Sequence, residues 1–151
     1  MIRAAASDEL PVLSALALRS KAVWGYSAAF LAACRAELTL GEDDLSLTFV
    51  KEIDGRIAGF YALSELDPER AELEFLFVEP WALRRGHGLA MLAHAREQAR
   101  RLGCRVIVIQ GDPHAAGFYA AAGARPIGVR ESASIPGRWL PLYELPCSED
   151  G

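Results

Sequence analysis

Two arginines and two glycines stand at residues 83–90, LRRGHGLA, between the strand-like run ELEFLFVEP and a helix-like run. Gly86 and Gly88 lack a Cβ, so the backbone there can bend and approach a ligand closely. A helix that begins near Gly88 leaves its first amides without intrahelical acceptors, and these amides and the helix dipole favour an anion. Arg84 and Arg85 add positive charge at the same point. The segment therefore predicts a binding site for a phosphate or pyrophosphate.

The alternative interpretation of this segment is an ordinary helix start with glycines in the turn. Two known nucleotide motifs do not fit it. A GxGxxG fingerprint needs a third Gly or Ala where Met91 stands, and the preceding strand is not the first of the fold. A P-loop needs a GK[ST] sequence, which is absent.

The 151-residue length and the 52% hydrophobic content predict one packed domain over residues 1–151. A formal net charge of −4 argues against nucleic acid as a partner, because binding to phosphate polymers needs an excess of Lys and Arg. No secretory leader and no run of about 20 apolar residues is visible, so we expect a cytoplasmic protein without membrane contact. The monomer and the homodimer both remain open.

Neither the cysteines nor the histidines form a metal-binding pattern. Cys34, Cys104 and Cys147 are odd in number and far apart, which gives no disulfide framework and no CxxC pair. The three histidines show no HExxH spacing. We therefore expect no metal site.

The remaining pattern predicts an α/β (α+β) fold with the order β-α-α-β-β-β-α-β-α-β-β. Ser7 and Ser27 are expected to cap the first two helices, and Asp54-Gly55 is a two-residue hairpin turn. A third helix is expected from about Gly88 to Leu102, followed by the central strand CRVIVIQ. Strict alternation in AELEFLFV places Glu72, Glu74, Leu76 and Val78 on one face, and Leu73, Phe75 and Phe77 on the other.

Two motifs in this order resemble the GNAT superfamily of N-acetyltransferases. RGHGLA, residues 85–90, is similar to the family's [QR]-x-x-G-x-[GA] motif, and FVEP resembles the preceding strand end. DPHAAGFYAAAGA, residues 112–124, is similar to the family's N-x-x-A-x-x-[FL]-Y-x-x-x-G-[FA] segment. The resemblance covers nearly the whole chain. It implies a GNAT-like mixed, mostly antiparallel sheet of about six or seven strands with about four helices on both faces.

The resemblance implies acetyl-CoA as cosubstrate and names the residues that would bind it. These are Phe77, Val78, Arg84, Arg85, Gly86, His87, Gly88, Leu89, Ala90, Asp112, Ala115 and Phe118. The chain departs from the family at Asp112, where Asn is usual. An ionised carboxylate cannot donate a hydrogen bond, but it can still cap the following helix.

The resemblance also implies three roles in catalysis. Glu74 or Glu72 would remove a proton from the amine, and we favour Glu74; the alternative is that both are solvated or paired with Arg84 or Arg96. The Val78 amide would stabilise the oxyanion. Tyr119 would assist departure of the thiolate, mainly as a hydrogen-bond donor, because full proton transfer is uphill by roughly 2 kcal/mol; the alternative is a core tyrosine.

The acceptor is the least specified part of the prediction. Trp24 and Tyr26 join the first two helices, where the family forms one wall of its acceptor site, although they could simply hold the helices together. We expect an N-acetyltransferase that acts on a primary amine of a small molecule or peptide through a ternary complex. A non-catalytic CoA-binding module and a binding protein for another phosphorylated metabolite are the alternatives.

Overall fold

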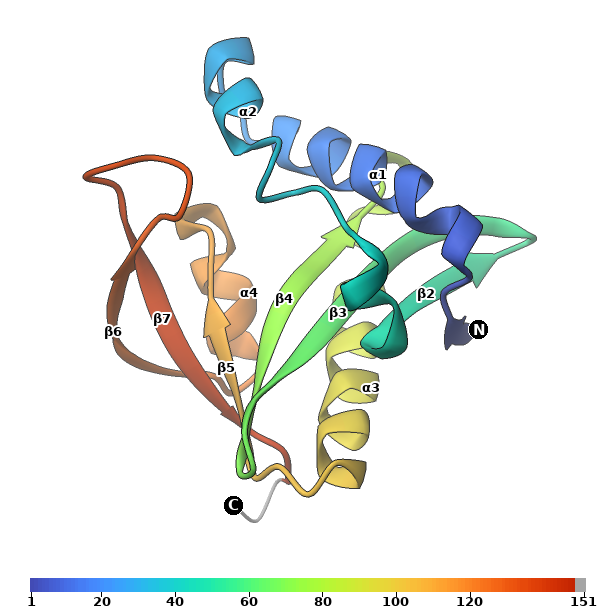
Figure 1. Cartoon of the computed structure of the whole chain (residues 1–151), viewed down its shortest axis with the longest axis vertical. Coiled ribbons are helices and arrows are strands. Elements are labelled where there is room, and N and C mark those ends of the chain that lie inside the picture. Colours follow the sequence, from blue (N-terminus) through green and yellow to red (C-terminus); the bar gives the residue numbers. More distant parts are fainter. Residues whose placement is uncertain (149–151) are drawn as a thin grey trace.

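A computed structural model of the chain, which describes residues 1–148, shows one seven-stranded mixed sheet with the strand order β1-β2-β3-β4-β5-β7-β6 (Figure 1). The strands are β1 (Ile2–Ala4), β2 (Thr48–Ile53), β3 (Arg56–Asp67), β4 (Arg70–Val78), β5 (Val106–Gln110), β6 (Arg125–Glu131) and β7 (Trp139–Pro146). The α-helices are α1 (Leu10–Ala22), α2 (Ala28–Cys34), α3 (His87–Arg101) and α4 (Ala116–Ala121), and the short 3₁₀ helices are η1 (Ser7–Glu9), η2 (Glu42–Leu47), η3 (Pro80–Ala82) and η4 (Pro113–Ala115). The predicted fold class and element order are confirmed.

One strand pair departs from the antiparallel pattern. β4 and β5 pair in parallel, from Arg70 with Val106 to Leu73 with Ile109, whereas the other neighbouring strands are antiparallel. β4 continues to Val78 without a partner on that side. Figure 1 shows the two strands close together at one end and separated at the other. The sheet is therefore open at the carboxyl ends of β4 and β5.

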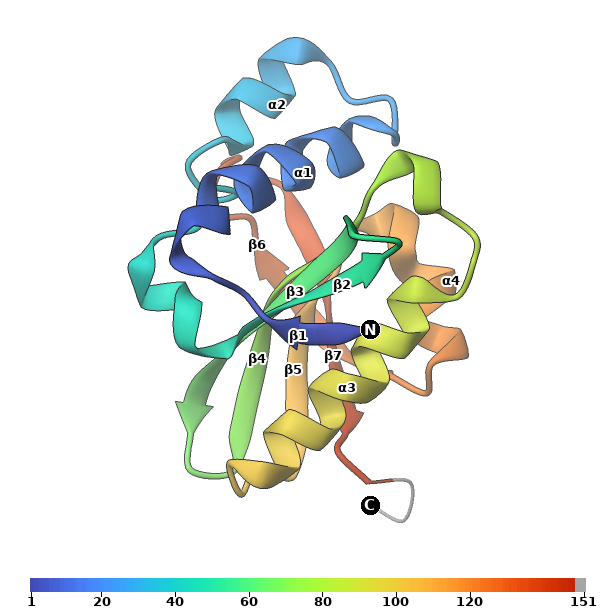
Figure 2. The same cartoon turned by 90° about the vertical axis from the view of Figure 1, so that its right-hand side faces the viewer.

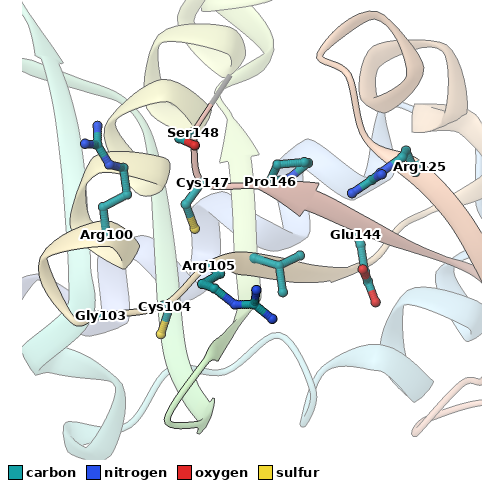
Figure 3. Close-up of a pocket in the computed structure, with 10 residues that line it drawn as sticks. Arg100, Gly103, Cys104, Arg105, Arg125, Glu144, Pro146, Cys147 and Ser148 are labelled. Atoms are coloured by element: carbon teal, nitrogen blue, oxygen red, sulfur yellow. The ribbon is translucent and has the colours of Figure 1, made fainter. Parts of the chain in front are cut away.

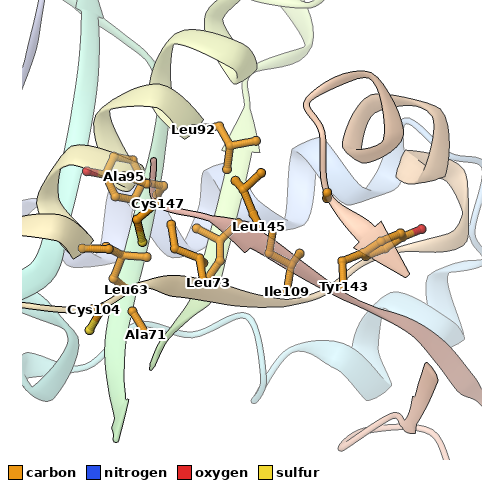
Figure 4. Close-up of a cluster of buried hydrophobic side chains, with 14 of the residues drawn as sticks. Leu63, Ala71, Leu73, Leu92, Ala95, Cys104, Ile109, Tyr143, Leu145 and Cys147 are labelled. Carbon is orange, nitrogen blue, oxygen red and sulfur yellow. The ribbon is translucent and has the colours of Figure 1, made fainter. Parts of the chain in front are cut away.

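Helices cover both faces of the sheet, and each face has its own hydrophobic core (Figure 2). On one face, α1 packs against β3 and β4 through Leu13, Leu16 and Ala17. On the other face, α3 and α4 pack against β3, β4, β5 and β7; Figure 4 shows part of this cluster, including Leu92, Ile109 and Leu145. The packing on this second face places the N-termini of α3 and α4 at the open end of the sheet.

Local sequence signals account for most element boundaries. Asp54 and Gly55 both have positive φ, 51° and 77°, as the turn of the β2–β3 hairpin requires. The Ser27 side chain accepts from the Phe30 amide and caps α2 as predicted. The prediction for Ser7 was wrong: its hydroxyl donates to Glu42, and α1 begins at Leu10 after η1.

The predicted alternation in β4 was also wrong, because the strand contains a bulge at Glu74. Leu73 pairs with Leu63 and Phe75 pairs with Ala62, so Glu74 is an extra residue without a partner on β3. Leu73 consequently packs in the α3-side core, whereas Phe75 packs in the α1-side core. Leu76 and Val78 contact the α3-side core, and they do not share a face with the two glutamates.

Candidate functional site

A cavity of about 520 Å³ occupies the opening between β4 and β5. It extends from the head of α3, past η4 and α4, to the joint between α1 and α2. Of the predicted catalytic and acceptor residues, it is lined by Glu72, Glu74, Tyr119 and Trp24. Of the predicted cofactor residues, it is lined by Phe77, Val78, Arg84, Gly86, His87, Gly88, Leu89, Asp112, Ala115 and Phe118. Arg85, Ala90 and Tyr26 do not line it.

The N-terminus of α3 presents main-chain N–H donors to this cavity. Gly86 caps the helix with a left-handed backbone, φ 81°, and Arg84 is also left-handed, φ 62°. The Gly86 carbonyl accepts from the Ala90 amide, whereas the amides of His87, Gly88 and Leu89 have no acceptor within residues 1–148. These three free donors and the helix dipole give this helix start the features that favour an anion, and the anion site remains a prediction.

Gly88 is also required for packing at this point. A Cβ on Gly88 would lie 3.0 Å from Cε1 of Phe118 on α4. The absence of a side chain at Gly88 therefore lets the start of α3 pack closely against α4. The neighbouring His87 ring is less suited to bind an anion, because burial and the charges of Lys51 and Arg85 lower its pKa. The group of His87 that is suited to an anion is therefore its main-chain amide.

The unpaired half of β4 exposes two further amides. The Glu79 amide donates to the Ala58 carbonyl on β3. Hydrogen bonding alternates along an antiparallel pair, so Phe75 and Phe77 direct their amides toward β3, whereas Leu76 and Val78 direct theirs to the side that β5 has left. The Leu76 amide is therefore a second candidate, beside the predicted Val78 amide, for the main-chain donor to the oxyanion. This follows from the strand register and not from any sequence motif.

Glu72 and Glu74 both lie at the cavity near the bulge. The Glu72 carboxylate accepts from Arg130 on β6 at 2.9 Å, so its partner is neither Arg84 nor Arg96. Glu74 accepts from the Ser64 hydroxyl at 2.7 Å and makes no ion pair within residues 1–148. Although the residue is exposed overall, partial burial of its carboxyl group and the nearby Glu72 raise the pKa of Glu74, and the Ser64 hydrogen bond opposes them only in part.

Tyr119 on α4 is a buried residue whose ring lines the cavity. Its hydroxyl has no hydrogen-bond partner within the described part of the chain, and burial raises its pKa. Gly111 permits this placement, because a Cβ there would lie 3.0 Å from Cε2 of Tyr119 and 3.1 Å from Cε2 of Tyr143. The hydroxyl is therefore protonated and available as a donor.

Asp112 and Tyr26 make their contacts within the protein. Asp112 caps η4 by accepting from the His114 amide at 2.9 Å, as predicted, and it also accepts from the Tyr26 hydroxyl at 2.8 Å. Tyr26 is not among the residues that line the cavity, whereas Trp24 is. Trp24 is 43% exposed, and its ring stacks on His114 with centroids 5.1 Å apart.

Several residues that line the cavity were not predicted. Gln110 is the last residue of β5, where β4 and β5 separate, and it lines the cavity. Its Nε2 is buried and has no hydrogen-bond partner within residues 1–148. Lys21 and Glu37 line the end of the cavity near the joint between α1 and α2, and Glu37 accepts from Ser134. Their sequence neighbours give no motif, and only the fold brings them together.

A second cavity, of about 510 Å³, lies at the other end of α3 (Figure 3). Arg100, Arg105 and Arg125 line it together with Cys104 and Cys147. The rise of an α-helix puts it about 20 Å from the free amides. It does not include the predicted site residues.

Residues 1–148 contain no group of three or more His, Cys, Asp and Glu residues that could hold a metal ion. In the same range, no helix has both the length and the apolar character needed to cross a membrane.

Comparison with known proteins adds a family and a set of similar folds. The model of the acetyltransferase (GNAT) family matches residues 15–124, and no curated protein matches the chain. A PaiA N-acetyltransferase from Thermoplasma acidophilum, solved with coenzyme A, superposes with a TM-score of 0.74 at 17% identity, over 95% of this chain and 96% of that one. The ribosomal-protein-S18-alanine N-acetyltransferase from Escherichia coli gives 0.72 at 22% identity, over 100% and 96%. An aminoglycoside 6'-N-acetyltransferase with coenzyme A gives 0.75 at 15% identity, over 98% and 97%.

Proposed function

The chain belongs to the acetyltransferase (GNAT) family, and we propose that it moves an acetyl group from acetyl-CoA to a primary amine of a small molecule or peptide by direct attack in a ternary complex. The observation that carries the proposal is the set of unpaired amides at the head of α3, which opens into the same cavity as Glu74 and Tyr119. One end of this cavity can hold a diphosphate, and the middle can hold a thioester.

The chain's own groups fit coenzyme A along this path. The amides of His87, Gly88 and Leu89 bind the diphosphate, and Arg84 adds positive charge beside them. The pantetheine arm lies along the unpaired half of β4, where Leu76 and Val78 offer main-chain groups in place of a neighbouring strand. Coenzyme A in the PaiA and aminoglycoside acetyltransferase structures supports this assignment.

The acceptor amine enters from the side of α1 and α2. Glu37 and Glu74 line this side without a cationic partner in the described residues, which favours a positively charged amine. Glu74 takes the proton from the ammonium group, and its raised pKa makes it a stronger base than an ordinary carboxylate. The free amine nitrogen then attacks the thioester carbon.

Two donors serve the charges that form in this attack. The amide of Leu76 or Val78 stabilises the oxyanion of the tetrahedral intermediate, a type of contact worth about 3–4 kcal/mol. The nitrogen of the intermediate releases its second proton to solvent. When the carbon–sulfur bond breaks, the Tyr119 hydroxyl donates a hydrogen bond to the thiolate, and solvent returns a proton to the thiolate. Products are the N-acetylated amine and free coenzyme A.

A panel of amines assayed by release of free thiol tests this function. The panel covers small amines, amino acids, antibiotics and peptide N-termini. Cys34, Cys104 and Cys147 are buried, so the thiol reagent reports mainly coenzyme A. We expect release that depends on at least one amine. Binding of acetyl-CoA without release by any amine would instead support a non-catalytic module.

A further inference from the structure

Asp112 lies at the centre of a network that joins three segments around the acceptor side of the cavity. Its Oδ2 accepts from the Tyr26 hydroxyl at 2.8 Å and from Lys21 Nζ at 3.4 Å. Its Oδ1 accepts from the amide and the ring of His114, both at 2.9 Å. Arg138 lies 3.7 Å from Oδ2. Both carboxylate oxygens are thus engaged by groups of the protein.

The partners of Asp112 come from parts of the chain that are far apart. Lys21 is in the last turn of α1, Tyr26 lies between α1 and α2, and Arg138 lies in the β6–β7 connection. Arg138 also donates to the Tyr26 hydroxyl at 2.7 Å. Asp112 therefore fastens the α1–α2 joint and the β6–β7 connection to the point where β5 ends.

The charge of Asp112 is essential to this arrangement. The side chains of Lys21 and Arg138 are only 14% and 20% exposed, and this carboxylate stands between them. Burial alone would raise the pKa of Asp112, but hydrogen bonds from the His114 amide and Tyr26 lower it below its ordinary value. An asparagine would keep one acceptor oxygen, but it would point an NH₂ donor at cations and donors.

The network reaches the cavity through His114 and Trp24. Asp112 holds the His114 ring, and the Trp24 ring stacks on that ring at an interplanar angle of 8°. Trp24, Lys21 and His114 line the cavity, and the Tyr26 ring contacts His114 edge-on and lies under Lys21 Nζ. The position of this wall is therefore set by a residue that need not touch the acceptor.

We propose that Asp112 is a positioning residue for the acceptor site, in which one carboxylate clamps the α1–α2 joint and the β6–β7 connection and so holds Trp24 as a wall of the cavity. The proposal rests on the proposed function only for the identity of the ligand that this wall receives. It moves Asp112 from cofactor binding, the role that the resemblance implies, to the acceptor side.

Hydrogen exchange of the free protein tests the clamp without any ligand. In Asp112→Asn we expect amides in residues 20–27 and 132–138 to exchange at least about tenfold faster than in the wild type, because the loss of the clamp favours local opening. Amides of β3 and β4 should be unchanged. Asp43→Asn, an exposed change on η2, is the matched control. Unchanged exchange in both segments would overturn the proposal.

Two further variants separate the clamp from a general loss of stability. Tyr26→Phe keeps the ring and removes only the hydroxyl, so it should speed exchange in the same segments, but less. Lys21→Met added to Asp112→Asn removes one unbalanced cation while keeping the aliphatic stem, and it should restore part of the protection. Further acceleration in the double variant would show that opposite charge is not what holds the segments.

The dissociation constant for coenzyme A and the KM for the amine then show whether Asp112 affects the binding of the cofactor or of the acceptor. For Asp112→Asn, the dissociation constant for coenzyme A should stay within about twofold, and KM for the best amine of the panel should rise at least about tenfold with little change in kcat. Weaker coenzyme A binding with an unchanged amine KM would contradict the proposal and show that Asp112 contributes to cofactor binding. If the proposed function fails because no ligand binds, the exchange data still decide the clamp.

Discussion

Leu73 of β4 and Ile109 of β5 are the last residues that pair between these two strands, and the strands separate directly beyond them. The bulge residue Glu74 follows Leu73, and Gln110 follows Ile109. The cavity with its free amides, its carboxylates and the Tyr119 ring lies in the resulting opening. The place where this parallel pair ends thus determines where the cavity lies, and the proposed site residues lie on either side of it.

Leu89→Asp tests the anion site at the head of α3. Leu89 is 49% exposed and is the third residue of the helix, where a carboxylate favours helix formation but repels a diphosphate. We expect coenzyme A binding to weaken at least about tenfold, or about 1.4 kcal/mol. Leu89→Asn is the isosteric neutral control. Calorimetry that gave equal coenzyme A affinities for the two variants would show that the diphosphate does not bind at this helix N-terminus.

Glu74→Gln tests the general base. Removal of a positioned base typically costs about 10²–10⁴ in rate, and we expect a loss in that range in kcat/KM for the amine. Wild-type activity should rise with pH through the raised pKa of Glu74, whereas this limb should be absent in the variant. Glu72→Gln is the matched control and should keep this limb, moved to lower pH because Glu72 contributes to the raised pKa of Glu74. A pH profile that Glu74→Gln leaves intact would assign the base elsewhere.

The same raised pKa predicts an effect of Glu74 on stability. A carboxyl group whose pKa is higher in the folded state binds its proton more tightly there, so stability is lost as pH rises through that pKa. Glu74→Gln should therefore unfold at a higher temperature than the wild type at neutral pH. The difference should vanish below the ordinary pKa of glutamate. A lower melting temperature at neutral pH would contradict this.

Tyr119→Phe should lower kcat while leaving coenzyme A binding and thermal stability nearly unchanged. The hydroxyl has no hydrogen-bond partner among residues 1–148, so its removal costs the fold little. The rate effect arises because the thiolate loses a donor as the carbon–sulfur bond breaks. Steady-state kinetics and calorimetry on the same preparation provide the comparison; identical kcat values would make Tyr119 a core residue only.

Gly111→Ala should displace Tyr119 and destabilise the protein. The new methyl group would lie about 3 Å from the rings of Tyr119 and Tyr143, and overpacking of this kind costs typically about 1–3 kcal/mol. Gly117→Ala, where a Cβ meets open space on α4, is the control and should be neutral or stabilising. Urea unfolding measures both. Equal stability of the two variants would show that the Tyr119 ring has room to shift.

The order of the elements and the start of α3 were predictable from sequence, because their signals are local. The Asp54-Gly55 turn, the Ser27 cap and the amides of residues 87–89 each depend on a few consecutive residues. The bulge at Glu74 was not predictable, since it is a property of the pairing with β3. The hydrogen-bond partners of the site residues were also not predictable, because they are distant in the sequence. Arg130 is 58 positions from Glu72, and Tyr26 is 86 positions from Asp112.

Calorimetric titration of the wild-type protein with acetyl-CoA, ATP and NAD tests most directly whether the amides at the head of α3 and the opening beside β4 together bind a thioester of coenzyme A. We expect acetyl-CoA to bind at least about tenfold more tightly than either nucleotide, because only its pantetheine arm can follow β4. Equal affinities for the three ligands, or no binding of acetyl-CoA, would contradict this.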